Sequence, residues 1–539
     1  MTAVNHQRMS SVDTAWLRMD TPGNAMMIVS VAATATPLHY AEFRRMIESR
    51  FLCFLRFRHR PAQDALGASW IEDDTFDLDQ HLTRAVLPGP AGKAELEALA
   101  ADLAGTPLDA RRPLWQVHFV ERYLGGSAWI LRLHHCYADG IAMVHVLLSM
   151  TEQDPGPALA GAKAGGRRKT SASGAKRPAV DLLPLLNWVE QRSQPASDIL
   201  ENVLAEGARL LEGGIHQLFH PDQAAAYALQ AGSLVGEFAR VLALPDDPET
   251  PLRGPLSGVK RVAWADPVPL HEVKTMGRAL DCTVNDVLMA TVAGALGSHL
   301  RDRDFDTDAL SVRSAMPVNL RAAEEPLTLG NKFGLVFVEL PIGIRNPLQR
   351  VYAMHDTMVA LKGSLQPPMT LMVLGLMGLL PAVIQAPAIE MFSRKGSLVA
   401  SNVPGPQAPL YLCGQRISEM YFWVPQSGTM GIGISILSYA GQVFFGIIAD
   451  QNLVADPQSV VDRIGPEFER LLLAVTVGAL GAREGRTRKP SPQPSPARSG
   501  RGSMKPSPQP SPARSGRGSR KPSPGLQGEG GAKRRVRAS

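Results

Sequence analysis

Apolar and polar residues follow two different patterns over residues 10–152. Apolar runs at 26–33 and 128–134 predict strands, and apolar residues at helical spacing over 39–49 and 94–103 predict helices. Because strands and helices are interleaved, the pattern indicates an α/β region.

A second region of the same kind begins near residue 259. The pattern predicts a strand at 259–264 and helices at 270–280 and 285–300. Further strands are expected at 310–317, 335–340, 431–439 and 443–449, the last two joined by a hairpin turn at Ala440-Gly441. The folded part of the chain is therefore expected to consist of two α/β halves.

The composition changes between these two regions. Residues 155–179 are rich in Pro, Gly, Ala, Ser, Lys and Arg, as linkers are, and residues 180–242 have helical spacing. We therefore predict an N-terminal domain at 9–154, followed by a linker at 155–179. A helical connection and a C-terminal domain are expected at 180–480.

The last segment, 481–539, differs from the rest of the chain. Residues 489–503 recur unchanged at 505–519, and no Leu, Ile, Val or Phe occurs between 489 and 525. Such a segment buries too little apolar surface to offset its chain entropy. The sequence therefore predicts a disordered, basic Pro/Ser/Gly/Arg repeat tail.

The positive charge of the chain lies in this tail. Residues 483–539 contain 15 Lys and Arg and 2 acidic residues, a net charge of +13, which leaves −7 for residues 1–482 because the whole chain carries +6. An acidic body does not favour nucleic-acid binding by the folded part. For the tail, attraction to anionic lipid or nucleic-acid phosphate is the candidate role.

Length and composition exclude several classes of protein. A chain of 539 residues with 45% apolar and 20% charged residues is neither a single small domain nor a wholly disordered protein. The four cysteines, Cys53, Cys136, Cys282 and Cys413, have neither CxxC nor CxxH spacing, so we expect no disulfide framework and no metal site. Residues 1–18 contain no apolar run of signal-peptide length, and a reducing cytoplasm is the expected location.

An uncharged stretch at 363–389 raises the question of a membrane. It is strongly apolar at 369–380, but prolines interrupt it, whereas a spanning helix needs about 20 apolar residues in a row. Three interpretations stay open for this stretch: a spanning helix, a buried core helix, and a lipid-facing helix that docks on a membrane or oil droplet.

The residues with the clearest chemical signature come at the end of the strand predicted at 128–134. His134 and His135 are followed, after three residues, by Asp139-Gly140 and a helix. Neighbouring side chains on a strand face opposite ways, so we expect one histidine to be chemical and the other structural. An imidazole can accept a proton near neutral pH, and such a base contributes about 10²–10⁴-fold to a rate.

Asp139 and Gly140 are expected to shape the turn after the histidines. The Asp139 carboxylate could orient the loop, the imidazole or a distant arginine such as Arg321. Gly140 is expected to permit a backbone turn that a Cβ atom would hinder. Adjacent histidines at a strand end are often incidental, but their spacing to Asp139-Gly140 favours a function.

This stretch resembles the HHxxxDG motif of the acyl-CoA-dependent acyltransferases, which include chloramphenicol acetyltransferases and peptide-synthetase condensation domains. Over roughly residues 9–478, further segments resemble the ordered landmarks of the bacterial wax ester synthase/diacylglycerol acyltransferase family. These segments are Ser11–Trp16, Thr75–His81, Pro107–Trp115, Thr283–Ala290, Met316–Arg321, Gly330–Gly334 and Ser401–Pro406.

The resemblance implies a fold and an activity. The fold is α/β, with two chloramphenicol-acetyltransferase-like domains and the active site in a tunnel at their interface. The activity is that of an O-acyltransferase, which moves a long-chain fatty acyl group from acyl-CoA to the hydroxyl of diacylglycerol or of a long-chain fatty alcohol. Acyl-CoA is a co-substrate in this family, and the resemblance implies no cofactor and no metal.

The resemblance also implies residue roles. The second motif histidine, His135, corresponds to the general base, and His134 and Asp139 shape the site. Asn285-Asp286 corresponds to the Asn-Asp pair of the family, in which Asn285 would help to hold the thioester oxygen. Direct transfer needs no enzyme nucleophile, and the sequence contains no GxSxG elbow and no GxxxxGK[ST] loop.

Structural explanations stay open for several of these positions. Asn285 could simply cap the helix that it begins, and Asp286 would be favoured at the positive end of that helix. Trp115 could serve only in packing, and residues 402–406 could form a rigid turn near the domain interface. Gln116 departs from the family, which usually has Glu at this position.

Two other functions also stay open. One is a different HHxxxDG reaction, such as condensation on a carrier-protein thioester or polyketide-linked ester formation. The other is a non-catalytic lipid-droplet or nucleic-acid-binding protein in which the tail matters. For the acyltransferase, whose substrates partition into membranes, we expect peripheral association with the inner membrane face or with lipid inclusions.

Overall fold

The computed structural model describes residues 7–153, 236–321 and 328–487, except for positions 22, 65–66 and 380–381. The chain divides into two units, Met1–Glu484 and Gly485–Ser539, and the fold described below is that of the first unit. The predicted linker at 155–179 lies outside the described residues, and so does the predicted tail from 488 onward. Of the predicted helical connection, residues 236–243 are described and are helical.

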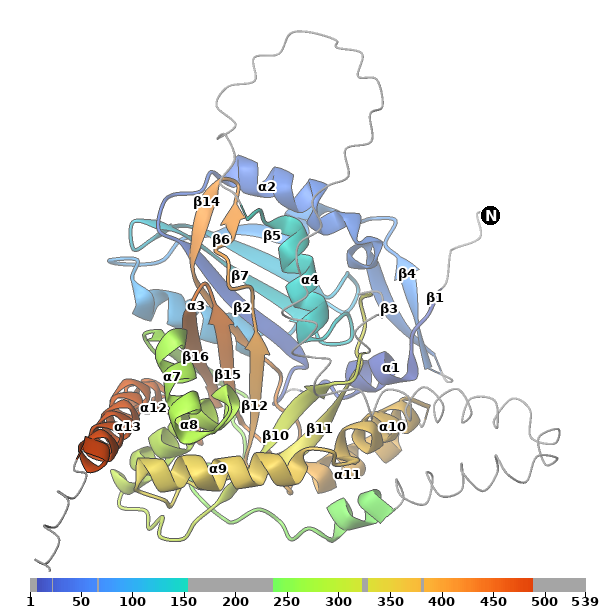
Figure 1. Cartoon of the computed structure of the whole chain (residues 1–539). Coiled ribbons are helices and arrows are strands. Elements are labelled where there is room, and N and C mark those ends of the chain that lie inside the picture. Colours follow the sequence, from blue (N-terminus) through green and yellow to red (C-terminus); the bar gives the residue numbers. More distant parts are fainter. Residues whose placement is uncertain are drawn as a thin grey trace, which may run out of the picture. The chain divides into compact units, whose positions relative to one another are not determined.

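A six-stranded sheet with its helices forms what we term the first half of the fold (Figure 1). Neighbouring strands pair antiparallel except β5 and β6, which are parallel. In spatial order the strands are β13 (Tyr411–Leu412), β14 (Gln415–Trp423), β2 (Met27–Thr34), β7 (Gly126–His134), β6 (Trp115–Tyr123) and β5 (Leu82–Ala85).

Four helices and a small sheet complete the first half. The helices are α1 (Ser11–Arg18), α2 (Tyr40–Ser49), α3 (Lys93–Gly105) and α4 (Gly140–Met150). The small sheet has the order β1 (Gln7–Arg8), β4 (Gly67–Glu72) and β3 (His59–Asp64).

A seven-stranded sheet with its helices forms the second half (Figure 1). Its strands lie in the order β11 (Phe333–Leu340), β10 (Val312–Asn319), β12 (Leu398–Pro404), β15 (Ile432–Tyr439), β16 (Gln442–Asp450) and β8 (Lys260–Trp264), with β9 (Val268–Pro269) also paired to β16. The helices are α7 (Leu270–Leu280), α8 (Val284–Arg301), α9 (Pro347–Leu361), α10 (Gln366–Leu379), α11 (Ala382–Ser393), α12 (Gln458–Val461) and α13 (Ile464–Thr487).

These elements confirm the predicted α/β class. The turn between β15 and β16 lies at Ala440-Gly441, where both residues have positive φ values, 48° and 80°. Such a pair of left-handed residues matches the right-handed twist of the strands in a two-residue hairpin. Residues 481–487 continue helix α13.

The two halves are not consecutive along the chain. Strand β14 belongs to the 180–480 segment, yet it pairs antiparallel with β2 of the first sheet, with Trp423 opposite Val29. Without β14, β2 would present an unpaired edge with its backbone groups exposed. The buried core of the first half also includes Trp264, Leu320 and Phe333 from the second half.

The uncharged stretch at 363–389 forms α10 and α11, and α10 packs against α1 and β11. Most of the described side chains of α10 are buried, as the core-helix interpretation predicts, whereas Leu376 and Leu379 are exposed. In the part of the chain that the structure describes, no single helix is both long and apolar enough to cross a membrane. One bent pair, α7 with α8, meets the length and composition criteria at an angle of 103°.

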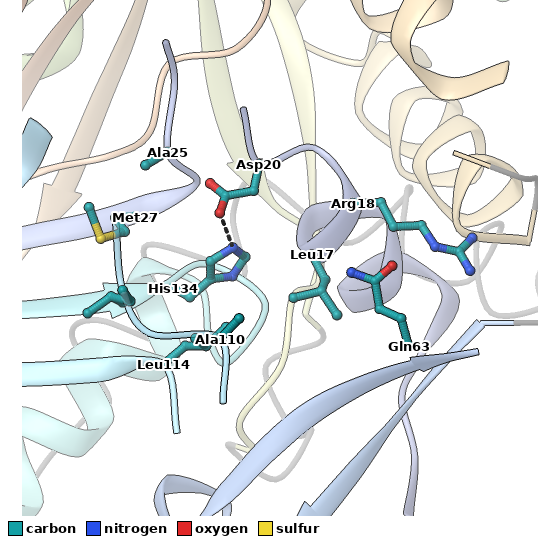
Figure 2. A pocket seen from close by; sticks show the side chains of 10 residues that line it. Leu17, Arg18, Asp20, Ala25, Met27, Gln63, Ala110, Leu114 and His134 are labelled. Carbon is teal, nitrogen blue, oxygen red and sulfur yellow. Dashed lines mark ion pairs between the residues drawn. The ribbon is translucent and has the colours of Figure 1, made fainter. Parts of the chain in front are cut away.

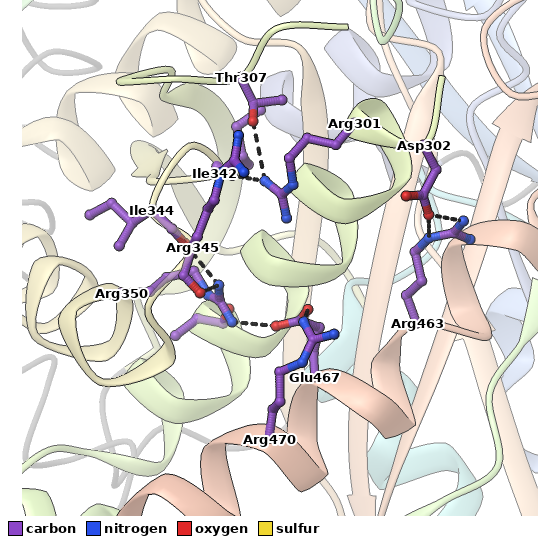
Figure 3. Close-up of polar contacts among 11 residues, drawn as sticks. Arg301, Asp302, Thr307, Ile342, Ile344, Arg345, Arg350, Arg463, Glu467 and Arg470 are labelled. Carbon is purple, nitrogen blue, oxygen red and sulfur yellow. Dashed lines mark hydrogen bonds and ion pairs between the residues drawn. The ribbon is translucent and has the colours of Figure 1, made fainter. Parts of the chain in front are cut away.

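A buried ion pair joins three helices of the second half (Figure 3). The Arg350 guanidinium on α9 donates to Glu467 Oε2 on α13 at 2.5 Å and to the carbonyl oxygen of Ala290 on α8 at 2.8 Å. Both charged side chains are almost completely buried. A Cβ atom at Gly294 would lie 2.3 Å from the guanidinium, so the absence of a side chain there makes room for the pair.

We expect Glu467→Gln to lower the free energy of unfolding by about 3–5 kcal/mol, because Arg350 would keep a buried charge without a carboxylate partner. Glu469→Gln, at an exposed position two residues further along α13, is the matched control and should change stability by no more than about 0.5 kcal/mol. Urea unfolding followed by tryptophan fluorescence measures both. Equal unfolding midpoints for the two variants would refute the role assigned to the pair.

Candidate active site

The two motif histidines lie where β7 ends and the chain turns toward α4. His134 is the last residue of β7 and pairs with Met27 of β2. Asp139 is the N-cap of α4, which begins at Gly140. The predicted order of strand, turn and helix is therefore present, and the two imidazoles have different surroundings.

The His134 side chain is buried, and its two ring nitrogens differ. Nδ1 accepts a hydrogen bond from the backbone N–H of Cys136 at 3.2 Å. Nε2 lies 4.0 Å from Asp20 Oδ2 and makes no hydrogen bond to any described residue. Burial, and then the neighbouring His135, lower the pKa of His134 to about 3. Because Nδ1 accepts, the neutral ring carries its proton on Nε2.

The His135 ring is held by aromatic side chains. It stacks on Trp16 with a centroid distance of 4.4 Å, and the Phe333 ring lies 5.5 Å away. Its backbone N–H donates to Met26 at 2.7 Å, and its carbonyl accepts from Asn331 Nδ2 at 2.7 Å. Burial lowers the pKa of His135 to about 4, against the opposing charge of Asp139, so the ring is neutral at neutral pH. Nδ1 is buried and has no hydrogen-bond partner in the described part of the chain.

The Asp139 carboxylate connects the start of α4 to the second half. It accepts from the backbone N–H of Ala142 at 3.0 Å, which caps the helix. It also accepts from the Arg321 guanidinium and, at 3.0 Å, from the backbone N–H of Lys332. The predicted pairing of Asp139 with Arg321 is therefore present, and both side chains are buried.

The structure corrects the reason given for Gly140. The residue does not have a left-handed φ. A Cβ atom built at this position would meet only Val403 Cγ2, at 3.6 Å, which is ordinary van der Waals contact. The backbone turn therefore does not require glycine at this position.

The Asn285-Asp286 pair lies in the first turn of α8. The N-cap is Thr283, and Asp286 completes a capping box with it, so the interpretation of Asn285 as the cap is wrong. The Asn285 side chain instead accepts a hydrogen bond from Asn402 of β12. Val403, the next residue of β12, is the one that faces Gly140, so β12 passes the start of α4 next to the residue that bonds Asn285. Residues 402–404 belong to a strand, which corrects the predicted turn.

Residues 115 and 116 have packing and bonding roles in the first half. Trp115 is fully buried, and its Nε1 donates to the carbonyl oxygen of Phe57 at 2.7 Å, as the packing interpretation predicts. Gln116 Oε1 accepts from the buried Arg132 guanidinium at 2.6 Å. The Gln116 amide therefore supplies an acceptor oxygen for Arg132, as a glutamate would, but carries no negative charge.

Several residues near the histidines were not singled out as site residues from the sequence. Asp13 Oδ1 accepts from Asn331 Nδ2 at 2.8 Å, and the same amide donates to His135. Trp16 supports the His135 ring, and Asp20 lies beside His134. Asp13, Trp16 and Asn331 fall within the family landmarks at Ser11–Trp16 and Gly330–Gly334, which is the signal that could have identified them.

A cavity of about 270 Å³ opens on the His134 side of the motif (Figure 2). It is lined by Leu17, Arg18, Asp20, Ala25, Met27, Gln63, Leu108, Ala110, Leu114 and His134. All of these residues belong to the first half, so this cavity does not test the predicted tunnel between the halves. In the described part of the chain, the side chains with metal-binding geometry are Cys282, Asp286 and His355, and neither motif histidine is among them.

We expect Asp139→Asn to lower the free energy of unfolding by about 3–5 kcal/mol, because Arg321 would be left buried without a counter-charge. Gly140→Ala is the neighbouring control, with an expected change of less than about 1 kcal/mol, since the added Cβ finds space beside Val403. Chemical denaturation of both variants gives the comparison. A stable Asp139→Asn protein, or an equally large loss for Gly140→Ala, would contradict this account.

Comparisons with known proteins agree with this geometry. The catalytic-domain model of the wax ester synthase/diacylglycerol acyltransferase family matches residues 9–288, and its C-terminal-domain model matches residues 329–472. A Mycobacterium tuberculosis protein named as a probable diacylglycerol O-acyltransferase is 30% identical over 77% of this chain and 84% of its own length.

Solved structures show the same fold at low sequence identity. The wax ester synthase/diacylglycerol acyltransferase of Marinobacter aquaeolei is 18% identical, with a TM-score of 0.59 over 87% of this chain and all of that one. A trichothecene 15-O-acetyltransferase of Fusarium sporotrichioides is 11% identical, with a TM-score of 0.52 over 87% of this chain and 95% of that one. With both domain models matched in order and the motif at the end of β7, the chain belongs to the wax ester synthase/diacylglycerol acyltransferase family.

Proposed function

We propose that this protein is an acyl-CoA-dependent O-acyltransferase that esterifies diacylglycerol or a long-chain fatty alcohol with a long-chain fatty acyl group. The observation that carries the proposal is the neutral His135 imidazole, held on Trp16 beside the contacts that join the two halves, in a chain of this family. Such an imidazole can accept the proton of an alcohol.

The proposed reaction is a direct transfer. A ring nitrogen of His135 takes the hydroxyl proton of the acceptor while the acceptor oxygen bonds to the thioester carbonyl carbon. The C–S bond of the resulting tetrahedral intermediate then breaks, and the imidazolium returns the proton to the departing thiolate of coenzyme A. The products are the ester and free coenzyme A, and no covalent enzyme intermediate forms.

The tautomer of His134 supports His135 as the base. Since the Cys136 N–H donates to Nδ1 of His134, its Nε2 carries the proton and is a hydrogen-bond donor, which cannot accept a proton from a substrate. One observation favours His134 as the base instead: His134, and not His135, lines the cavity. We propose that His134 instead acts as a fixed donor facing this cavity.

The carbonyl oxygen of the thioester becomes negatively charged as the acceptor attacks, so it needs a hydrogen-bond donor. We propose the Asn285 amide for this role. Its Oδ1 accepts from Asn402, which leaves the amide NH₂ of Asn285 as the donor. Arg321 is less suited, because its guanidinium already contacts Asp139 and the carbonyl oxygen of Gly330.

The cavity is slightly smaller than the range of about 300–1,000 Å³ typical of sites that enclose a whole small ligand. We therefore propose that it receives the reacting end of a substrate while the hydrocarbon chains extend beyond it. Such substrates reach the enzyme from a lipid phase.

We expect His135→Phe to reduce the rate of transfer by about 10²-fold or more with the fold retained, because phenyl keeps a ring against Trp16 and Phe333 but has no basic nitrogen. The assay offers labelled palmitoyl-CoA with diacylglycerol or hexadecanol and separates the products by thin-layer chromatography. His134→Ala should lower stability or have the milder effect on the rate, and His271→Phe, on the exposed face of α7, is the control.

The pH dependence of the transfer rate of the unchanged protein gives a second test of His135 as the base. Since the pKa of His135 is lowered to about 4, its neutral form persists as the pH falls below the ordinary imidazole value near 6.5, and the rate should fall only as the pH approaches about 4. Near-normal turnover by His135→Phe, combined with inactive His134→Ala, would transfer the base role to His134. If only a carrier-protein-bound donor reacted, the neutral-lipid assignment would fail.

We also propose that the protein associates peripherally with the inner membrane face or with lipid inclusions. Leu376 and Leu379 near the end of α10 are 50% and 54% exposed, and Met391 of α11 is also exposed. Single exposed apolar residues are normal on proteins, but these two leucines lie three residues apart on one helix face, within the stretch 363–389 that contains no charged residue. Burying them in lipid would remove apolar surface from water.

The double variant Leu376→Gln/Leu379→Gln should bind less to vesicles that contain anionic phospholipid and diacylglycerol in a flotation assay. Leu473→Gln/Val477→Gln, which changes two exposed apolar residues of α13, is the matched control and should float like the unchanged protein. Equal flotation of all three proteins would exclude α10 as the lipid-contacting surface.

A further inference from the structure

Three side chains with no role in the proposed reaction meet where α7, α8 and α9 come together. Cys282 lies in the short turn between α7 and α8, Asp286 in the first turn of α8, and His355 on α9. One potential ligand atom from each of the three residues lies within 4.8 Å of the other two. The cysteine and the histidine are far apart in sequence, so no spacing motif reveals the group.

The Asp286 carboxylate has an unused oxygen. Oδ2 accepts from the Thr283 backbone N–H at 2.7 Å and lies 2.8 Å from His355 Nδ1. Asp286 is completely inaccessible to solvent, and Oδ1 has no hydrogen-bond partner among the residues that the structure describes. Leaving a buried carboxylate oxygen without a partner costs free energy, and a cation placed beside it would remove that cost.

The electrostatic surroundings also favour a cation. The carboxylates of Asp281 and Asp356 act electrostatically on the Cys282 sulfur together with that of Asp286. A cation beside this sulfur would be attracted by all three negative charges, and the thiolate is the form of cysteine that binds metal.

We propose that Cys282, Asp286 and His355 bind a divalent transition metal ion, with zinc as the best match. Sulfur, imidazole nitrogen and carboxylate oxygen are the donors that zinc takes in proteins, and three protein ligands leave one position for water. The His355 side chain is 31% exposed, which gives an ion a path to the site.

The ion would connect α9 to the beginning of α8. Asn285 lies between two of the proposed ligands in sequence, and its side chain accepts a hydrogen bond from Asn402 of β12. A metal at this site would therefore stabilise the first turn of α8, on which the position of Asn285 depends. This effect of the metal is on the stability of the fold, so metal binding can be measured without substrate.

The test uses the full chain, freed of metal by a chelator and then titrated with zinc chloride or cobalt chloride. We expect about one ion per chain, absorption bands of thiolate–cobalt bonds in the cobalt form, and a higher unfolding temperature with metal. Cys282→Ser and His355→Asn should each weaken binding by about 10–100-fold or more. Cys413→Ser, which changes another partly buried cysteine, is the matched control and should bind like the unchanged protein.

Two results would overturn the proposal. One is the absence of thiolate–cobalt bands in the unchanged protein, which does not depend on the folding of any variant. The other is metal affinity that stays the same in Cys282→Ser and His355→Asn, since the ion would then be held elsewhere. Circular dichroism of each metal-free variant separates loss of the site from loss of the fold.

Discussion

The arrangement of the site depends on one buried carboxylate, that of Asp139. It caps α4 through Ala142, pairs with the Arg321 guanidinium, and accepts from the Lys332 backbone, so it fixes the first half and the second half to each other at the motif. A buried charge with these partners is stable, whereas removing one partner leaves the other charge uncompensated. Asp139 thus positions the turn after His135 and takes no part in the proposed proton transfer.

Burial around this contact explains the protonation of both histidines. Each ring lies where solvent cannot stabilise a positive charge, so each pKa is well below 6.5 and both rings are neutral. The local backbone then distinguishes them, because the Cys136 N–H donates to Nδ1 of His134 whereas Nδ1 of His135 has no hydrogen-bond partner within the described ranges. Two adjacent residues of the same type can therefore take different roles, one as a donor and one as an acceptor of protons.

The sequence predicted those elements of the fold that depend on residues close together in the chain. Helix α7 and the turn at Ala440-Gly441 follow from apolar spacing and from residues that tolerate positive φ. Contacts distant in sequence could not be read this way. The pairing of β14 with β2 and the bridge from Asn331 to His135 arise from tertiary packing, which periodicity does not encode. The prediction for Gly140 failed because a rule about turns was applied to the first residue of a helix.

The pairing of β14 with β2 also limits how the enzyme can open. β14 comes from the segment that builds the second half, and it is bonded to β2 over six register positions. Moving the halves apart as rigid bodies would break this ladder or pull on the short connections of β14, and would expose the buried pair of Asp139 and Arg321. Substrate entry by a wide hinge motion would therefore be costly. Rearrangement of side chains and loops around the His134 cavity is the less costly route, and it leaves the contacts that hold His135 in place.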